Sequence, residues 1–423
     1  MTDRRTFVRG ATAGALLAAL GDARVAFAAE LDRLTVRRAP RNAFHGLAAE
    51  YLLGPDVLYF NHGSIGTIPR IVHEAHVRYL TVCESNPWLH MWGEAWDAPR
   101  EEVRARAAAL LRCAPDEVAI THNTTEGFNL LAHGLDLRAG DEVVFSSLNH
   151  PGASVCWNHY AAARGFTVRR FEFPVQDAPS MTPDDVVALH LSHLTDRTRV
   201  LVVPHIDNTL GMLHPVRELA RAARARGVEY IAVDGAQALG MVPVDVRAAD
   251  IDFYSSSPHK WLQAPKGLGL FYARASVQPR VRAMWITSGQ GQLEGSARAF
   301  ENYGTRNLPE ALALGDAIAF QQSLGESAKL TRYNVMRDRF RAAVDASGGR
   351  LRWLSPAHRD LASSIYLIEV AGQPSAQLFE RLYRDHGVVF RAFRTQGIDG
   401  MRVSPNVQTT DQEIDRFIGL VTA

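Results

Sequence analysis

Short apolar runs alternate with longer amphipathic stretches through the middle of the chain. The runs with strand character are Val118–Thr121, Glu142–Ser146, Thr167–Phe173, Val200–Pro204, Tyr230–Val233, Phe253–Ser255 and Leu268–Tyr272. Apolar residues at helical intervals separate most of them, at Glu126–Leu135, Ala153–Arg164, Thr182–Leu194 and Val216–Arg226. Two further helices are predicted before the first strand, at Pro69–Cys83 and Pro99–Leu111. Strands that alternate with helices predict a mostly parallel sheet with helices on both faces.

Polar residues of different kinds follow several of these runs. Two threonines, Thr124 and Thr125, open the helix after the first run, and His150 follows the second. Asn208 follows the run that ends at Pro204, while Asp234 and Gln237 follow Val233. Because ligands of such sheets bind at the carboxyl ends of strands, we expect these side chains to converge. Backbone N–H groups and hydroxyls at a helix N-terminus also make a site for phosphate.

Lys260 lies in the connection between the last two predicted strands, within Ser255-Ser256-Ser257-Pro258-His259-Lys260-Trp261. A lysine can form a Schiff base with a carbonyl compound when its surroundings favour the neutral amine. A serine-rich loop around a lysine is by itself ordinary surface structure. Asp234, 26 positions earlier, suggests instead a pocket shared by a carboxylate and this amine.

Composition restricts the class of protein. The chain has 423 residues, of which 47% are hydrophobic and 22% charged, so a large core divided over two or three sub-domains is expected. A net charge of +1 argues against nucleic acid as a partner. The three cysteines, Cys83, Cys113 and Cys156, have no spacing typical of a metal site.

The N-terminus has the pattern of an export signal. Arg4-Arg5 precedes a mildly apolar run, Gly10 to Gly21, and Ala26-Phe27-Ala28 follows with the small residues of a cleavage site. We therefore expect residues 1–28 to be a twin-arginine signal peptide, read by the twin-arginine export machinery, and the mature protein to be periplasmic without a stable membrane span. A retained anchor or an amphipathic helix remains the alternative. Residues 29–57 are expected to run irregularly over the surface.

The order of these motifs resembles the class V aminotransferases, which are pyridoxal-phosphate enzymes of fold type I. The resemblance covers roughly residues 57 to 420 and is greatest to the isopenicillin N epimerase-like branch. It implies an α/β fold, with a large cofactor-binding domain at residues 57–310 around a mostly parallel seven-stranded sheet. Residues 29–56 would form an N-terminal segment, and residues 311–423 a smaller α/β domain.

The resemblance also implies roles for individual residues. Lys260 would hold pyridoxal 5'-phosphate as a Schiff base, and Asp234 would pair with the pyridine nitrogen so that the ring acts as an electron sink. His150 would stack on the ring, and Gln237 and Asn208 would hydrogen-bond its phenolate oxygen. Asn61, His62 and Arg402 would contact the substrate, with Arg402 holding its carboxylate. The phosphate would be held by Thr124, Thr125, Ser257 and His259, and by Thr305 from the second subunit of a homodimer.

The reaction is left open by the residues themselves. Transamination ranks slightly above epimerisation, because epimerisation needs a second positioned acid, for which His62 and His150 are candidates. A lyase is a further outcome, as is maturation of the glutamate side group of the siderophore pyoverdine, in which a periplasmic member of this branch acts. Desulfurases of this family carry a mobile cysteine well after the Schiff-base lysine. Because no cysteine follows Cys156 in this chain, we do not expect cysteine desulfuration. A binding protein that has lost catalysis and a non-enzymatic partner of an envelope assembly are the alternatives outside enzymes.

Overall fold

The computed structural model describes residues 4–37, 44, 46–91 and 96–423. A seven-stranded sheet forms its centre, in the order β2-β8-β7-β6-β5-β3-β4. Only β8 runs against its neighbours; the other strands are parallel to one another. The strands are β2 (Val118–Thr121), β3 (Glu142–Ser146), β4 (Thr167–Phe171), β5 (Thr198–Pro204), β6 (Tyr230–Asp234), β7 (Phe253–Ser256) and β8 (Gly269–Ala273). The predicted mostly parallel α/β sheet is confirmed.

Burial along the strands explains why they read as continuous apolar runs. Every residue of β6 and of β3 is buried, since helices cover both faces of the sheet. By contrast β4 lies at the edge of the sheet and exposes Thr167, Arg169 and Arg170, whose charges discourage pairing with another chain. The helices around the sheet are α4 (Asp97–Leu111), α5 (Thr124–Gly134), α6 (Pro151–Arg164), α7 (Pro183–Ser192), α8 (Val216–Ala225) and α9 (Leu308–Ser323).

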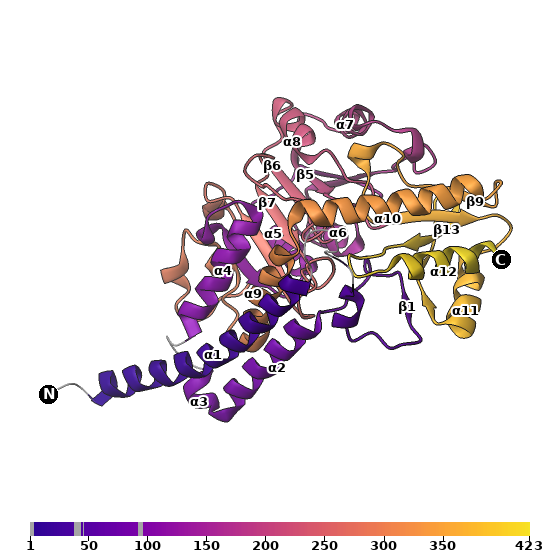
Figure 1. The fold of residues 1–423 in the computed structure, drawn as a ribbon. Helices are drawn as coiled ribbons and strands as arrows, with labels where there is room; N and C mark the ends of the chain where they lie inside the picture. The colour runs from indigo at the N-terminus through magenta and orange to yellow at the C-terminus, as the bar shows by residue number, and fades with distance from the viewer. Residues whose placement is uncertain (1–3, 38–43, 45, 92–95) are drawn as a thin grey trace.

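A second, antiparallel sheet lies in the C-terminal part of the chain (Figure 1). Its strand order is β12-β13-β10-β9. Its strands are β9 (Leu351–Trp353), β10 (Tyr366–Val370), β12 (Arg391–Thr395) and β13 (Ile398–Val403). Three helices accompany it: α10 (Glu326–Ala346), α11 (Ser375–His386) and α12 (Asp411–Thr422). The short strands β1 (Leu58–Tyr59) and β11 (Val388–Val389) pair in parallel and attach the segment after residue 57 to this part. The domain boundaries expected from the sequence stay a prediction.

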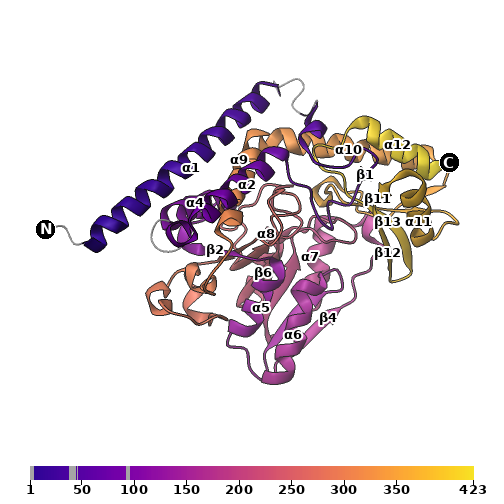
Figure 2. The ribbon, with the colours of Figure 1, turned by 90° about the horizontal axis from the view of Figure 1, so that it is seen from below.

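The N-terminal region is helical where the sequence predicted an irregular path. Residues Arg4–Arg37 form one 34-residue helix, α1, which lies beside α2 (Arg70–Ser85) and α9 (Figures 1 and 2). The short α3 (Pro87–His90) also contacts it. Leu20, Phe27 and Leu34 are buried against the body, so the expectation of an irregular path after residue 28 is wrong for residues 29–37. Apolar positions spaced by seven residues lie on one face of a helix, which gives α1 its buried stripe.

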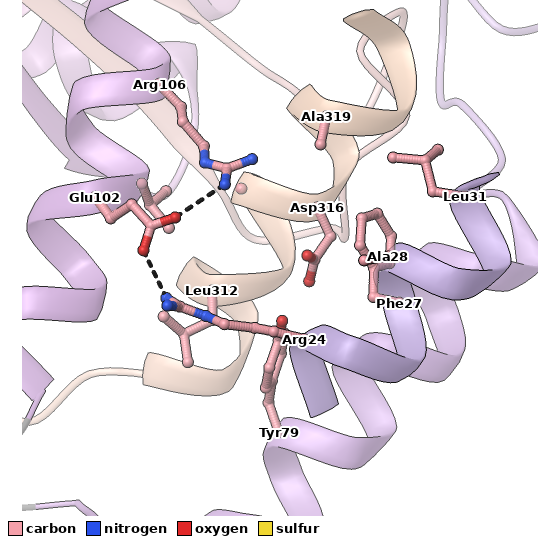
Figure 3. Close-up of a pocket in the computed structure, with 12 residues that line it drawn as sticks. Arg24, Phe27, Ala28, Leu31, Tyr79, Glu102, Arg106, Leu312, Asp316 and Ala319 are labelled. Carbon is pink, nitrogen blue, oxygen red and sulfur yellow. Dashed lines mark hydrogen bonds and ion pairs between the residues drawn. The ribbon is translucent and has the colours of Figure 1, made fainter. Parts of the chain in front are cut away.

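One wall of a small cavity of about 260 Å³ is formed by α1 (Figure 3). Arg24 makes an ion pair with Glu102 of α4 at 2.9 Å, and Phe27 lies across from Asp316 of α9. Within the described residues, no helix is both long and apolar enough to cross a membrane. The side chains of Arg4 and Arg5, on which the export motif rests, lie outside the described part.

Candidate active site

The carboxyl ends of four parallel strands supply the polar side chains of the candidate site. Asp234 is the last residue of β6, and Lys260 follows β7 by four positions. Thr124 opens α5 three residues after β2, and Asn208 follows β5. Because β2, β5, β6 and β7 run in the same direction, these positions meet at one edge of the sheet.

Lys260 and Asp234 influence each other's charge. Burial lowers the pKa of Lys260 to about 8, although the Asp234 carboxylate acts in the opposite direction. Burial raises the pKa of Asp234. The hydrogen bond that Ala236 N–H donates to its Oδ1 over 2.9 Å and the charge of Lys260 both act to lower this pKa. A lysine with a lowered pKa supplies the neutral amine that a Schiff base requires.

His150 is the N-cap of α6, and its Nδ1 accepts a hydrogen bond from Gly152 N–H at 3.0 Å. Burial lowers the pKa of His150, and the charges of Asp234 and Lys260 both act on it. His150 follows the carboxyl end of β3, which is parallel to β5, so it lies at the same edge of the sheet as the lysine and the carboxylate. Pro151 at the first helical position fixes where α6 begins and so where this imidazole lies.

A phosphate-sized anion has several donors here. Thr124 N–H donates to Ser257 Oγ at 3.0 Å, and the hydroxyls of the two residues are 2.8 Å apart. Thr125 follows on the exposed first turn of α5, whose N-terminus favours negative charge. The Nδ1 atom of His259 is buried and has no hydrogen-bond partner among the described residues. Burial, with the charges of Lys260 and Lys266, lowers the pKa of His259 to about 4, so the ring is neutral.

Gln237 and Asn208 form different kinds of hydrogen bond in the site: Gln237 through its side chain and Asn208 through its main chain. The Gln237 amide donates from Nε2 to Gly63 O at 2.7 Å and accepts at Oε1 from Trp261 Nε1 at 2.8 Å. Asn208 contributes its main-chain oxygen, which accepts a hydrogen bond from Arg402 at 2.8 Å. Trp261 did not stand out in the sequence, apart from its position next to Lys260.

Arg402 is buried on β13 beside the loop that follows β1. Its Nη2 donates to Asn61 Oδ1 at 2.9 Å and to Ser64 Oγ at 2.5 Å, while its Nε has no partner among the described residues. No carboxylate of the described chain forms an ion pair with this guanidinium, which also lies 5.3 Å from the centre of the Phe393 ring. Burial lowers the pKa of Arg402 to about 10, with Arg391 acting in the same direction. A buried cation with neutral partners is suited to bind a carboxylate ligand.

His62 is held inside the protein. Its Nδ1 lies 3.1 Å from the main-chain oxygen of Ser404, and its Nε2 lies 2.7 Å from the amide nitrogen of Gln408. The ring therefore donates from Nδ1 and accepts at Nε2, and burial lowers its pKa to about 4. Both nitrogens are engaged, so His62 fixes the position of the loop that carries Asn61.

Thr305 lies apart from this cluster within the chain. It is exposed and lines a separate cavity of about 500 Å³ with Gly304, Trp96 and Arg100. The expected contribution of Thr305 to a second subunit's phosphate site stays a prediction. The three cysteines are free thiols, and the described residues contain no cluster of side chains able to hold a metal ion.

Asp207 is a residue of the site that the sequence analysis did not select. Its carboxylate accepts hydrogen bonds from the backbone of Thr209 and Met212, both at 2.8 Å, and from Leu210. These bonds close the turn that presents Asn208 to Arg402. An aspartate followed by Asn-Thr-Leu-Gly is the available signal, since aspartates commonly organise such turns.

Known proteins resemble the chain over most of its length. The isopenicillin N epimerase of Streptomyces clavuligerus is 29% identical over 387 residues, which span 88% of this chain and 96% of that protein. The same enzyme of Amycolatopsis lactamdurans is 31% identical over 391 residues, or 86% of this chain and 94% of that protein. The solved structure of a cysteine desulfurase from Thermococcus onnurineus has a TM-score of 0.77 at 22% identity, covering 89% of this chain and 97% of that one.

The expectation against cysteine desulfuration is wrong. The cysteine desulfurase of Dickeya dadantii is 32% identical over 285 residues, which span 64% of this chain and 66% of that enzyme. Enzymes that act at the same carbon of an amino acid can share the lysine, the carboxylate and the surrounding fold. The absence of one cysteine after Cys156 therefore does not separate the classes.

The residues present fit pyridoxal phosphate. An unpartnered buried nitrogen of His259 beside the N-terminus of α5 suits the phosphate, and the buried carboxylate of Asp234 suits a pyridine nitrogen. Lys260, with its lowered pKa, suits the aldehyde. The model of the family described as Aminotransferase class-V matches residues 58–417. With this fold, these pocket residues and that match, the chain belongs to the class V aminotransferase family, whose cofactor is pyridoxal phosphate.

Proposed function

We propose that the chain is a transaminase that acts on an amino acid or on a metabolite that carries one. This proposal rests on the presence of two buried groups in one site. Lys260 is an amine with a pKa of about 8, and Arg402 is a cation whose hydrogen-bond partners are neutral. The first supplies a base for the proton on Cα, and the second supplies a binding site for the α-carboxylate.

Different residues of the chain bind the substrate and transfer its proton. Arg402 orients the substrate carboxylate through its planar fork of N–H groups. Lys260 Nζ takes up the Cα proton, and Asp234 beside it maintains the charge balance of the buried pocket. Pyridoxal phosphate, when bound, would supply an electron sink for the C–H bond that is broken and an acceptor for the amino group.

The state of the two histidines favours transamination over epimerisation. Epimerisation requires a second acid that returns a proton to the opposite face of Cα. His62 is neutral and hydrogen-bonded at both ring nitrogens, and His150 accepts at Nδ1 from Gly152 N–H. Because His62 is engaged at both ring nitrogens and His150 accepts at Nδ1, we assign the proton transfer to Lys260.

Epimerisation is the second candidate. It is favoured by the two isopenicillin N epimerases, which align with 88% and 86% of this chain. Loss of a substituent in a lyase reaction and maturation of a pyoverdine-type siderophore side group are further alternatives. Substrate trials should therefore include free amino acids, small peptides and siderophore precursors.

We also propose that the protein is exported by the twin-arginine pathway and acts in the periplasm as a homodimer. The export proposal is supported by Arg4-Arg5 and by the small residues Ala26 and Ala28. Changing both arginines to lysine should leave the full-length chain in the cytoplasm, as measured by fractionation; periplasmic mature protein from that variant would contradict the proposal. Light scattering of the purified protein tests the dimer.

The experiment that tests the proposed reaction is a half-reaction with the holoenzyme. The protein is mixed with pools of amino-acid substrates while the cofactor absorbance and the products are followed by spectroscopy and mass spectrometry. Transamination converts the bound cofactor to its aminated form and releases a 2-oxo acid. Return of the starting spectrum with exchange of the Cα hydrogen identifies epimerisation instead, and release of sulfide from cysteine identifies desulfuration.

A further inference from the structure

Trp261 is a fully buried aromatic residue next to Lys260 in the chain. Its indole packs edge-on against the ring of Tyr333, with the ring centres 5.9 Å apart. The hydroxyl of Tyr333 is itself bound to Asn406 at 2.7 Å, so the indole rests against a fixed neighbour. Its Nε1–H group donates to Gln237 Oε1 at 2.8 Å.

This hydrogen bond determines which way the Gln237 amide faces. Gln237 is 3% exposed, and its Nε2 donates to the main-chain oxygen of Gly63 at 2.7 Å. A flipped amide would place its NH₂ group against the indole N–H and its oxygen against Gly63 O. Both contacts would then be repulsive, and buried polar groups would lose their partners.

We propose that Trp261 is a positioning residue that keeps Gln237 oriented as a hydrogen-bond donor in the cofactor pocket. An amide nitrogen has two N–H groups, and one of them is used by Gly63 O. The other is free to donate to an acceptor oxygen of the bound cofactor. The inference rests on the cofactor assignment and on Gln237 lying against that oxygen, but it does not require transamination.

The same hydrogen bonds connect the cofactor side of the pocket to the substrate loop. Gly63 N–H donates to Ser404 Oγ at 3.0 Å, and Gly66 N–H donates to His259 O at 3.0 Å. A Cβ atom at Gly66 would lie only 2.1 Å from the main-chain oxygen of Lys260, so the loop and the lysine segment approach closely. Trp261 thus supports Gln237 directly and the loop through Gln237.

A donor near an anionic oxygen stabilises its deprotonated form. Loss of the Gln237 donor should therefore raise the pH at which the spectrum of the bound cofactor titrates. Replacing Trp261 by Phe removes the indole N–H while keeping an aromatic ring in the core. The Gln237 oxygen then lacks its partner, and the amide is free to flip.

The test compares Trp261→Phe with Trp353→Phe, each prepared with bound cofactor. Trp353 is a matched control, because it is buried and its Nε1 has no partner among the described residues. We expect Trp261→Phe to raise the titration midpoint of the cofactor absorbance by about one pH unit and to weaken cofactor affinity roughly tenfold, as for the loss of one buried hydrogen bond. Trp353→Phe should change neither value.

A double-mutant cycle separates positioning from general destabilisation. In a Gln237→Leu background, Trp261→Phe should cause no further shift of the midpoint, since the amide that it orients is already gone. Equal shifts in the two backgrounds would overturn the proposal, as would a Trp261→Phe enzyme that titrates like the wild type. If Trp261→Phe fails to fold, hydrogen exchange of the Trp261 indole N–H decides: it should be faster in Gln237→Leu than in the wild type, and an unchanged rate would overturn the proposal.

Discussion

The guanidinium of Arg402 donates a hydrogen bond to Asn61 Oδ1 at 2.9 Å and so joins two positions 341 residues apart. Asn61 follows β1, and Arg402 belongs to β13 of the second sheet. A substrate carboxylate that enters the pocket would compete with Asn61 and Ser64 for the same N–H groups. Arrival of substrate is thereby linked to the arrangement of the loop around Gly63.

Arg402→Lys should weaken the binding of carboxylate substrates. Lysine keeps the charge but loses the planar pair of donors, so KM should rise by the equivalent of about 2 kcal/mol, with a smaller effect on kcat. Arg391→Lys is the matched control, because Arg391 is exposed and lies opposite Arg402 in the strand pairing. Steady-state kinetics measure both; an unchanged KM in Arg402→Lys would show that the carboxylate binds elsewhere.

The pKa of Lys260 predicts how apoprotein captures its cofactor as the pH changes. The neutral amine is the reactive form. With a pKa of about 8, the neutral fraction of Lys260 rises roughly tenfold between pH 6 and pH 7 and levels off above pH 8. The rate of covalent capture, followed by stopped-flow absorbance, should follow this curve. Asp234→Asn removes the carboxylate that raises this pKa and should move the curve to lower pH. A capture rate that does not vary between pH 6 and 9 would contradict a lowered pKa at Lys260.

Glu301 should be important for stability in acid. Burial would raise the pKa of Glu301, but Arg104 at 2.7 Å and Arg306 outweigh it and lower the pKa to about 2. Since the pKa is lower in the folded state, the carboxylate stabilises the protein above about pH 4.3, and this contribution is lost as the pH falls toward 2. Glu301→Gln should cost about 3 kcal/mol at neutral pH, because it removes the buried carboxylate shared by Arg104 and Arg306 and leaves Arg104 only the half-buried Glu101 as an ion-pair partner.

Denaturant unfolding at pH 7 and at pH 3 measures this effect. Asp345→Asn is the control, since Asp345 pairs with Arg341 on the exposed side of α10 and such pairs contribute under about 0.5 kcal/mol. A loss of stability equal to that of Asp345→Asn would contradict the role assigned to Glu301.

The docking of α1 predicts local behaviour in the full-length chain. Phe27→Asp places a charge in the apolar contact with α2 and α9, so α1 should detach while the body of the protein stays folded. Limited proteolysis should then cut within residues 20–37 much faster than in the wild type. Val25, which is 69% exposed on the same helix, is the control: Val25→Asp should leave the cleavage rate unchanged. Equal rates for Phe27→Asp and the wild type would contradict docking through this face.

The sheet could be predicted because its strands are short apolar runs that are buried on both faces. The residues that converge at its edge could be predicted for the same reason: Asp234 and Thr124 directly follow such runs. The docking of α1 could not, since its partners Tyr79, Glu102 and Asp316 lie far along the chain and none of them marks a helix-binding surface. Similarly, nothing near His62 indicates its hydrogen bond to Gln408, 346 residues away.

A single turnover of the holoenzyme with an amino-acid substrate in deuterated water tests transamination by Lys260 most directly. Transamination should give one equivalent of 2-oxo acid and one aminated cofactor for each chain, and neither product with Lys260→Ala, which should remain folded by circular dichroism. Recovery of the amino acid with deuterium at Cα, together with an unchanged cofactor, would contradict transamination. Wild-type turnover by Lys260→Ala would contradict the assignment of the lysine itself.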